Sequence, residues 1–491
     1  MNIYKSFEKA KNGTLIPVFN SGRTMESRYN PERDAQTLCN SIEEAFDFFL
    51  VLGIGSGLFI KNLSQRFPHA KILGLEIYKD DLSILENSEI VRELEENSLI
   101  KLISLDQLEK ALVQNYLPAK YGQIKIVEQK AWLAENKDFV ENINLILKKT
   151  IGLISADYSV QAHFGKIWNS NILNNARLAE KYNFALDIDI SKTAVIVAAG
   201  PSLDKTISLL KENQNFYIIS TDTASSILLK NKINPDLIIS IDGQNVSYNH
   251  FVELCPSAYA FDLSANFSAA KKIAEAGNKI FFFSSGHPLS TAISLSSSNY
   301  FPSLFSGAGT VTITALDFAV EAGFKNILIL GADFSYSRGK AYAAGSYLDS
   351  LYNMTSSSLK SSEQTFSNLM FRTELISSGE RKTTKVLQAY KASLEKYLIG
   401  KNIKYSYEDD IYKLTCSEGT SAKNNLFSSS LGNKGYILNS FFTKFKDASP
   451  EEAETILLPY IAWLRNNQKY QKYSYSELLK LAFNSIVRYN I

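Results

Sequence analysis

The central part of the chain alternates short apolar runs with helix-length segments, and this alternation limits the folds that the chain can adopt. The alternation predicts a mostly parallel sheet with helices on both faces. The apolar, strand-like runs are Ala194–Ala198, Phe216–Thr221, Leu237–Ile241, Ala258–Leu263, Lys279–Phe283 and Asn326–Gly331. The helical segments between them include Leu203–Glu212, Ala224–Lys230, Ala269–Ala276 and Val311–Ala322.

A similar, shorter series precedes the central one. Asp47–Gly55 and Lys71–Ile77 have the character of strands, and Leu58–Phe67 between them has helical spacing, which is typical of a βαβ unit. We interpret Ile124–Val127 and Ile151–Ile154 as further strands of this series. The residues before it, 1 to about 45, are expected to be irregular and then helical.

The last third of the chain changes in character. Residues 343–382 are rich in Ser, Thr and Asn, and we interpret them as a long loop. A helix is expected at Lys385–Leu398 and a strand at Ile403–Tyr407, and three helices are expected after residue 433. The prediction is therefore an α/β chain with a Rossmann-like N-terminal domain (residues 1–160), a central Rossmann-like domain with a mostly parallel sheet (residues 161–432) and a helical C-terminal region (residues 433–491).

The charge balance and the cysteines exclude several classes of protein. There are 52 Lys and Arg against 50 Asp and Glu, a formal charge of +2, which gives no support for a nucleic-acid-binding protein. Cys39, Cys255 and Cys416 are far apart in the chain and form no metal-binding or redox spacing. No apolar run reaches the roughly 18 residues that a membrane span requires. We therefore expect a cytoplasmic protein with no membrane span.

The predicted N-terminal domain contains a glycine loop that admits two interpretations. Val51–Gly57 reads VLGIGSG, and Glu76 ends the next strand-like run. Glycines after a first strand, with an acid about 20 positions later, can bind a nucleotide cofactor, and this arrangement resembles the opening of S-adenosylmethionine-dependent methyltransferases. The alternative is a tight turn without a cofactor. No methyl-acceptor motif follows Glu76, so we favour the structural turn.

A second glycine loop, in the central domain, is a candidate phosphate site. The segment Thr193–Leu203 reads TAVIVAAGPSL, in which a hydrophobic strand leads directly into Gly200, Pro201 and Ser202. A helix is expected to follow. The N–H groups at a helix start carry partial positive charge, and with the Ser202 hydroxyl they can bind an anion. The alternative is that Ser202 is a simple helix cap.

Three of the central apolar runs end in an aspartate. Asp222, Asp242 and Asp333 are therefore expected at the carboxyl ends of neighbouring parallel strands, where the ligand crevice of an open sheet lies. Carboxylates there can position a ribose or a base, or hold Mg²⁺ against phosphates. The alternative is that all three act as caps.

Several central motifs, in order along the chain, resemble the domain of the motility accessory factors, or Maf proteins. The motifs are VIVAAGPSLDKTISLL (residues 195–210), TDTASSILLKNKINPDLIISID (residues 221–242) and AGFKNILILGADFSYSRGKAYAAG (residues 322–345). Archaeal 6-hydroxymethylpterin diphosphokinases (MptE-like proteins) carry a similar domain. Ser27–Ala35 and Phe164–Asn175 also resemble Maf segments, so the resemblance extends over most of the chain.

The resemblance implies an activity, a donor and an acceptor. Maf proteins are thought to transfer nonulosonic acids, such as pseudaminic or legionaminic acid, from a CMP-activated donor to Ser or Thr of flagellin. Their central domain is similar to that of bacterial sialyltransferases with a Rossmann-like fold. On this resemblance the Gly200–Leu203 loop would lie near the donor nucleotide, and Tyr336 and Tyr342, after Asp333, would contact its phosphate. A phenol can donate a hydrogen bond to the leaving phosphate without adding charge.

Further residues follow from the same resemblance. Phe305–Thr314 (FSGAGTVTIT) matches the family pattern, and Cys416–Thr420 (CSEGT) resembles a family segment that is expected to complete the pocket. The residues expected to line the donor site are Gly200, Pro201, Ser202, Asp222, Gly307, Gly309, Thr310, Thr312, Glu418 and Gly419. The helical C-terminal region serves either packing or acceptor docking.

The sequence departs from the sialyltransferases at the general base. Those enzymes use a histidine after the tyrosine pair, and none of the four histidines of this chain lies in that stretch. His287 follows a strand-like run and is a candidate for the site, although a lone histidine is more often a packing or capping residue. Asp333 and Asp242 are the other candidates. The sequence therefore leaves the identity of the general base undetermined.

Three functions are compatible with these features. The leading hypothesis is a glycosyltransferase that moves a nonulosonic acid from a CMP donor to flagellin and so supports flagellum assembly and motility; Mg²⁺ is a candidate cofactor. The second is a diphosphokinase that transfers pyrophosphate from ATP, which would need Mg²⁺. The third is a flagellin-binding accessory factor without catalysis. The acidic strand ends and the tyrosine pair favour an enzyme.

Overall fold

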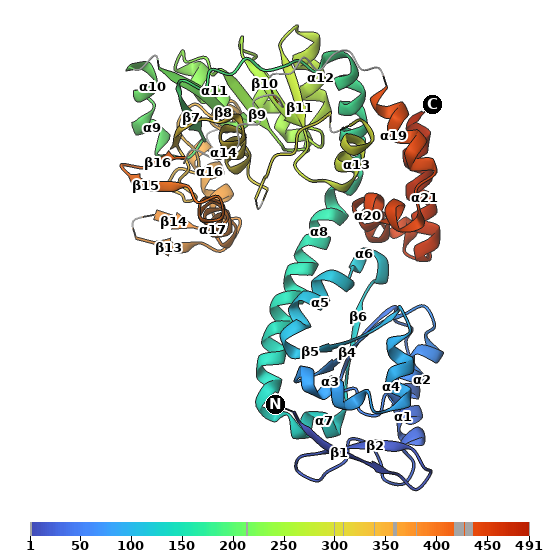
Figure 1. The fold of residues 1–491 in the computed structure, drawn as a ribbon. Helices are drawn as coiled ribbons and strands as arrows, with labels where there is room; N and C mark the ends of the chain where they lie inside the picture. The colour runs from blue at the N-terminus through green and yellow to red at the C-terminus, as the bar shows by residue number, and fades with distance from the viewer. Residues whose placement is uncertain are drawn as a thin grey trace. The chain divides into compact units, whose positions relative to one another are not determined.

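The computed structural model describes residues 2–212, 215–298, 300–307, 309–337, 339–356, 361–379, 381–416, 427 and 436–490. The chain forms two compact units (Figure 1). The first unit comprises Met1–Gly165 and Leu458–Ala482, and the second comprises Lys166–Leu457 and Phe483–Ile491.

The first unit is built on a four-stranded parallel sheet with the strand order β5-β4-β3-β6. All five residues of β3 (Phe48–Leu52) are buried, as expected for a strand that helices cover on both faces. The other strands are β4 (Lys71–Glu76), β5 (Ile100–Ser104) and β6 (Ile124–Glu128). The helices are α1 (Pro31–Asn40), α2 (Leu58–Arg66), α3 (Lys79–Leu85), α4 (Glu89–Glu95), α5 (Leu108–Asn115), α6 (Pro118–Tyr121) and α7 (Lys130–Glu135).

An antiparallel hairpin forms where the sequence predicted irregular structure. Strand β1 (Tyr4–Lys9) pairs with β2 (Leu15–Phe19), and Tyr4 lies opposite Phe19. The sequence of β1, YKSFEK, is mostly polar, and only Tyr4 of it is buried. A strand with so few buried side chains gives no apolar run, and this explains why the prediction missed it.

A long helix, α8 (Lys137–Tyr182), contains the segment Ile151–Ile154 that was expected to be a strand. That prediction was wrong. Ile151 and Ile154 are both half-buried, whereas the two residues between them are exposed. A spacing of three is the helical period, and four residues are too few to separate a strand from a helix by pattern alone.

The second unit is built on an eight-stranded sheet with the order β11-β10-β9-β8-β7-β12-β16-β15. The six strands from β11 to β12 are parallel, and β16 and β15 are antiparallel to their neighbours. The sheet therefore confirms the predicted α/β, mostly parallel architecture. The strands are β7 (Thr193–Val197), β8 (Phe216–Thr221), β9 (Leu237–Ser240), β10 (Ala258–Asp262), β11 (Ile280–Phe283), β12 (Asn326–Leu330), β15 (Lys404–Glu408) and β16 (Ile411–Thr415).

Helices cover both faces of this sheet. Ala194 and Ile196 of β7 belong to an apolar cluster with α14 (Val311–Ala322), whereas Val195 and Val197 belong to another cluster with α11 (Asp222–Lys230). Alternate side chains of one strand thus enter two separate cores. The helices are α9 (Leu203–Thr206), α10 (Leu209–Glu212), α11 (Asp222–Lys230), α12 (Phe267–Glu275), α13 (Pro288–Ser296), α14 (Val311–Ala322) and α17 (Lys385–Gly400), with a 3-10 segment at Asn245–Phe251.

The Ser- and Asn-rich segment 343–382 contains regular structure instead of the long loop that was predicted. Ser346 caps α15 by accepting a hydrogen bond from the Asp349 N–H, and Ser361 caps α16 in the same way. Residues that suggested a loop therefore begin helices. The elements are α15 (Tyr347–Met354), α16 (Ser362–Met370), β13 (Ile376–Ser378) and β14 (Arg381–Thr383).

The C-terminal region is helical, as predicted. Ser449 and Glu452 form a reciprocal capping box at the start of α20. Among the residues described, no helix is both long and apolar enough to cross a membrane. The helices are α19 (Ile437–Lys446), α20 (Pro450–Asn466) and α21 (Tyr475–Val487).

The strand order creates a topological switch point in each unit. In the second unit, β7 lies between β8 and β12, so the chain leaves β7 on one side of the sheet and returns on the other. In the first unit, β3 lies between β4 and β6 in the same manner. Ligands of open α/β sheets bind at the carboxyl ends of the strands at such switch points. Each predicted glycine loop follows one of these two central strands.

Candidate functional site

The loop after β7 is held by a carboxylate that comes from the end of β12. The Gly200 N–H donates to the Gly331 carbonyl at 2.8 Å, and the Ser202 N–H donates to Oδ2 of Asp333 at 2.8 Å. A Cβ on Gly200 would collide with both Oδ2 of Asp333 and the Gly331 carbonyl. Glycine is needed at position 200 because the two strand ends approach so closely there.

The side chain of Asp333 is buried, and both of its carboxylate oxygens accept hydrogen bonds. Its side chain is 2% exposed, and Oδ1 accepts a hydrogen bond at 3.1 Å from the guanidinium of Arg381 on β14. Arg381 also pairs with Asp410, in the turn between β15 and β16. Burial raises the pKa of Asp333, and the hydrogen bond from Ser202 and the charge of Arg381 oppose that rise. The geometry gives Asp333 the role of fixing the loop.

The loop offers less to an external anion than the sequence predicted. The helix that follows, α9, has only four residues, and the Leu203 N–H donates to the Gly200 carbonyl. The Ser202 N–H is already taken by Asp333. A carboxylate of the chain thus occupies the position where the sequence predicted a phosphate, while the buried Ser202 hydroxyl has no hydrogen-bond partner among the residues described.

A better anion site lies at the start of α14. This helix has twelve residues, and its N-cap Thr310 accepts a hydrogen bond from the Ile313 N–H at 3.2 Å. The first N–H groups of a helix have no acceptor within the helix, and its dipole favours negative charge there. Gly309, just before the cap, has a φ of +85°, which other residues rarely adopt. The start of α14 can therefore hold a phosphate.

These elements surround one pocket of about 300 Å³. It lies among the loop after β7, the start of α14 and the segment that follows β12. Seven predicted site residues line it: Gly200, Gly309, Thr310, Thr312, Asp333, Tyr336 and Tyr342. Five others are not among its described lining residues: Pro201, Ser202, Asp222, Asp242 and Gly307. The predicted Glu418 and Gly419 lie outside the described residues.

The two tyrosines are held at the pocket by backbone contacts. The Tyr336 N–H donates to the Lys382 carbonyl at 2.6 Å, and the Lys382 N–H donates back at 3.0 Å. Beside Tyr342, the Ala343 N–H donates to the Ala199 carbonyl at 2.9 Å. Burial raises the pKa of both tyrosines. Both phenols are therefore neutral at physiological pH and able to donate a hydrogen bond.

The other two aspartates, Asp222 and Asp242, differ in their burial and in their hydrogen bonds. Asp222 is 2% exposed and accepts hydrogen bonds from the Thr223 N–H at 2.7 Å and from the Ser240 hydroxyl at 2.7 Å, so it ties the ends of β8 and β9 together. Asp242 is half-buried, and Oδ1 accepts from the Gln244 N–H at 2.9 Å. Burial raises the pKa of Asp242. Its charge also helps to raise the pKa of Tyr390, which lines the pocket.

His287 caps a helix and is not among the described lining residues of this pocket. Its Nδ1 accepts a hydrogen bond from the Leu289 N–H at 3.2 Å at the start of α13, and its ring lies 5.6 Å from that of Trp168. Burial lowers its pKa to about 3, so the ring is neutral. The structure gives this histidine a capping and packing role.

Three residues of the site escaped the sequence analysis. Arg381 and Asp410 brace Asp333 from two hairpins, and Tyr390 on α17 lines the pocket. The contact between Arg381 and Asp333 joins residues 48 positions apart. No periodic pattern or motif marks such a contact, so only a resemblance that covered these residues would have found them.

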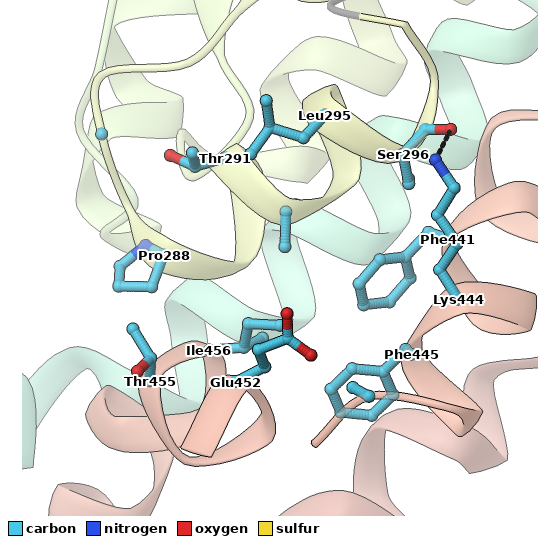
Figure 2. Close-up of a pocket in the computed structure, with 13 residues that line it drawn as sticks. Pro288, Thr291, Leu295, Ser296, Phe441, Lys444, Phe445, Glu452, Thr455 and Ile456 are labelled. Carbon is cyan, nitrogen blue, oxygen red and sulfur yellow. Dashed lines mark hydrogen bonds between the residues drawn. The ribbon is translucent and has the colours of Figure 1, made fainter. Parts of the chain in front are cut away.

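A larger, mostly apolar cavity of about 570 Å³ lies between α13, α19 and α20 (Figure 2). The rings of Phe441 and Phe445 line it beside Ile456. Lys444 donates to the Ser296 carbonyl at 3.3 Å at its edge. This lining is poor in groups that recognise phosphates or sugars, so we place the candidate site in the smaller pocket.

No group of three or more His, Cys, Asp or Glu side chains with the arrangement of a metal site occurs among the residues that the structure describes.

One protein-family model matches the central part of the chain. Residues 169–339 match the model of the 6-hydroxymethylpterin diphosphokinase MptE-like family. This match confirms the part of the sequence resemblance that concerns the central domain.

Two relatives and one solved structure are also similar to the chain. An uncharacterized protein of Treponema pallidum (strain Nichols) is 35% identical over 144 residues, which cover 29% of this chain and 69% of that protein. A second uncharacterized protein of that strain is 34% identical over 144 residues, 28% of this chain and 51% of its own length, so the match spans about half of it. The structure of a Maf glycosyltransferase from Magnetospirillum magneticum AMB-1 is 14% identical, with a TM-score of 0.49, over 98% of this chain and 90% of that one.

Proposed function

The chain belongs to one family with the first Treponema pallidum protein and carries the MptE-like domain, and from this premise we propose that it is a glycosyltransferase of the Maf type. Its donor would be a CMP-activated nonulosonic acid, and its acceptor a Ser or Thr of flagellin. The observation that carries the proposal is the pocket that is lined both by the start of α14 and by two neutral tyrosines.

Each wall of the pocket has a part in the proposed reaction. The start of α14 binds the donor phosphate, since its N–H groups and dipole favour an anion. Tyr336 and Tyr342 donate hydrogen bonds to the CMP phosphate as the bond to the sugar breaks. Asp333 fixes the Gly200 loop that forms the adjoining wall.

The acceptor hydroxyl needs a base, and Asp242 fits that role better than Asp333. Both oxygens of Asp333 already accept hydrogen bonds, from Ser202 and from Arg381. Burial raises the pKa of Asp242, as it does that of Asp333, so the difference between them lies in their hydrogen bonds. Asp242 is not among the described lining residues of the pocket, but it acts electrostatically on Tyr390 in the pocket wall. A carboxylate with a raised pKa is a stronger base at neutral pH than an ordinary one.

The family description favours one other candidate. A diphosphokinase would bind ATP with Mg²⁺ and would transfer pyrophosphate to a hydroxymethyl group. The two proposals differ in the nucleotide that binds, so a binding experiment separates them.

CMP should raise the thermal stability of the full chain, whereas ATP with Mg²⁺ should not. Each nucleotide would be tested with and without Mg²⁺. A ligand at 100 times its dissociation constant stabilises the native state by about 2.7 kcal/mol. Thr312→Phe should remove the effect of CMP by filling the pocket, and Thr291→Phe, the same change in the apolar cavity, should not. Stabilisation by ATP with Mg²⁺ but not by CMP would favour the diphosphokinase.

A further inference from the structure

The glycine loop of the first unit has the geometry of a ligand site. It joins β3 to α2 at the point where the strand order of the sheet reverses. Gly53, Gly55 and Gly57 have φ angles of +93°, +61° and +86°, which other residues rarely adopt. In an open α/β sheet, a loop of this kind usually approaches a bound cofactor.

Here the chain itself fills the space beside the loop. Oε1 of Glu26 accepts a hydrogen bond from the Ser56 N–H at 2.6 Å, and a Cβ on Gly55 would collide with that oxygen. A Cβ on Gly53 would lie 2.6 Å from Cγ of Trp132 and 2.8 Å from Cε of Met25. The glycines therefore make room for side chains of the same unit.

Glu76, the acid that could bind a ribose, also makes hydrogen bonds within the unit. Glu76 is fully buried, and its Oε1 accepts hydrogen bonds from the Ile54 N–H at 2.7 Å and from the Tyr4 hydroxyl at 3.0 Å. Its Oε2 accepts from Nε1 of Trp132 at 2.7 Å. Both oxygens thus have partners inside the unit, which supports the interpretation of the loop as a structural turn.

The Glu26 carboxyl lies at an energetically costly position. Its Oε2 is buried and has no hydrogen-bond partner among the residues described. Burial raises the pKa of Glu26 to about 7, as it does for Glu76. A buried carboxyl with one unsatisfied oxygen is costly unless its surroundings favour an anion. The hydrogen bond from the Ser56 N–H favours the ionised carboxyl and opposes the rise in its pKa, but burial has the larger effect.

We propose that the first unit is self-liganded, with the carboxyl of Glu26 in the position where the glycine loop would otherwise hold an external carboxylate or phosphate. Met25 and Tyr4, which are 5% and 0% exposed, complete the closure. The second unit uses a related device, because Asp333 accepts from the Ser202 N–H after the other glycine loop. There, however, a pocket stays open beside the carboxylate.

Hydrogen exchange of the full chain tests this proposal, with S-adenosylmethionine and acetate as probes and the amides of residues 53–60 as the readout. In the wild type neither probe should change the exchange rate. Glu26→Ala should speed exchange by about tenfold, the factor that corresponds to one lost hydrogen bond. Acetate should slow exchange again in this variant only. Glu43→Ala, which removes an exposed carboxyl, should behave as the wild type.

Two results would overturn the proposal. The first is protection of residues 53–60 by S-adenosylmethionine in the wild type, which would show that an external ligand displaces Glu26. The second is a Glu26→Ala variant that exchanges like the wild type or ignores acetate. If Glu26→Ala does not fold, the experiment with the wild-type protein and S-adenosylmethionine still tests the proposal. Glu26→Gln provides a second variant. Its amide oxygen can still accept a hydrogen bond from the Ser56 N–H, so slow exchange should be preserved.

The same carboxyl should make the stability of the chain depend on pH. Because folding raises the pKa of Glu26 from 4.5 to about 7, the folded state should lose stability as the pH rises from about 4.5 to about 7. The other titratable groups that face this region are Glu76 on β4, Tyr4 on β1 and Asp81 on α3. Burial also raises the pKa of Glu76, so its ionisation changes the stability in the same direction. Glu26→Gln should weaken the pH dependence of the urea midpoint, and Glu43→Gln should not. An unchanged dependence in Glu26→Gln would show that Glu26 is not a buried ligand.

Discussion

Asp333→Ala should abolish sugar transfer and lower the free energy of unfolding by about 3 kcal/mol. The change leaves the Ser202 N–H without its acceptor and the Arg381 guanidinium without one of its two carboxylates. Removal of one partner of a buried ion pair typically lowers the free energy of unfolding by about 3–5 kcal/mol. Because Arg381 is partly exposed, we expect a loss at the lower end of this range. Urea unfolding and a transfer assay with a CMP-sugar donor would measure the two effects. Wild-type turnover in this variant would remove Asp333 from the site.

The variant alone does not separate a positioning role from that of a base, but the pH profile does. If Asp333 acts by holding the loop, Arg381→Met should also lower kcat, and the two changes together should cost less than their sum. The remaining activity of Arg381→Met should keep the acid limb of the wild-type profile. Asp242→Asn, in contrast, should remove that limb, because it removes the proposed base. Loss of the acid limb in a soluble Asp333→Asn variant, with the limb kept in Asp242→Asn, would reverse the two roles.

The fold could be predicted where the burial of side chains produces a recognisable order of apolar and polar residues along the sequence. Strands such as β7 and β12 are apolar along most of their length because helices cover both faces of the sheet, so each appears in the sequence as a continuous run. Strand β1 buries only Tyr4 and gives no run, and the hairpin of β13 and β14 is too short for periodicity to appear. These elements form because tertiary contacts select them, and a local pattern does not contain that information.

The site could be predicted in part, for a related reason. Gly200 and Thr310 follow rules of strand ends and helix caps, which are local, and both line the pocket. The contact between Asp333 and Ser202 joins residues 131 positions apart, and it fills the predicted phosphate position with a carboxylate. A sequence shows that an acid ends a strand. It does not show whether that acid faces a ligand or its own backbone, and only the fold decides between them.

Tyr336→Phe and Tyr342→Phe should each lower kcat by about 100-fold and should weaken CMP binding much less. The negative charge on the CMP phosphate grows as the bond to the sugar breaks, so a hydrogen bond to it strengthens in the transition state. Loss of one preorganised donor of this kind typically costs on the order of 10²-fold or more in rate. Because burial raises the pKa of both phenols, they stay protonated, and the effect should persist between pH 6 and 8. Steady-state kinetics and CMP titration would measure kcat and affinity separately.

A third tyrosine provides the matched control. Tyr259, on β10, is also buried, and its hydroxyl donates to the Cys255 carbonyl at 3.1 Å, but it is not among the described lining residues of the pocket. The same hydroxyl accepts a hydrogen bond from the Cys255 N–H at 3.1 Å. Tyr259→Phe should therefore lower stability by about 2 kcal/mol, the net value of two hydrogen bonds, and leave kcat unchanged. Phenylalanine preserves ring packing at all three positions, so only the two pocket variants should lose rate. If removal of both pocket hydroxyls leaves kcat unchanged, the tyrosines serve packing, and the proposed stabilisation of the leaving phosphate must come from the start of α14 alone.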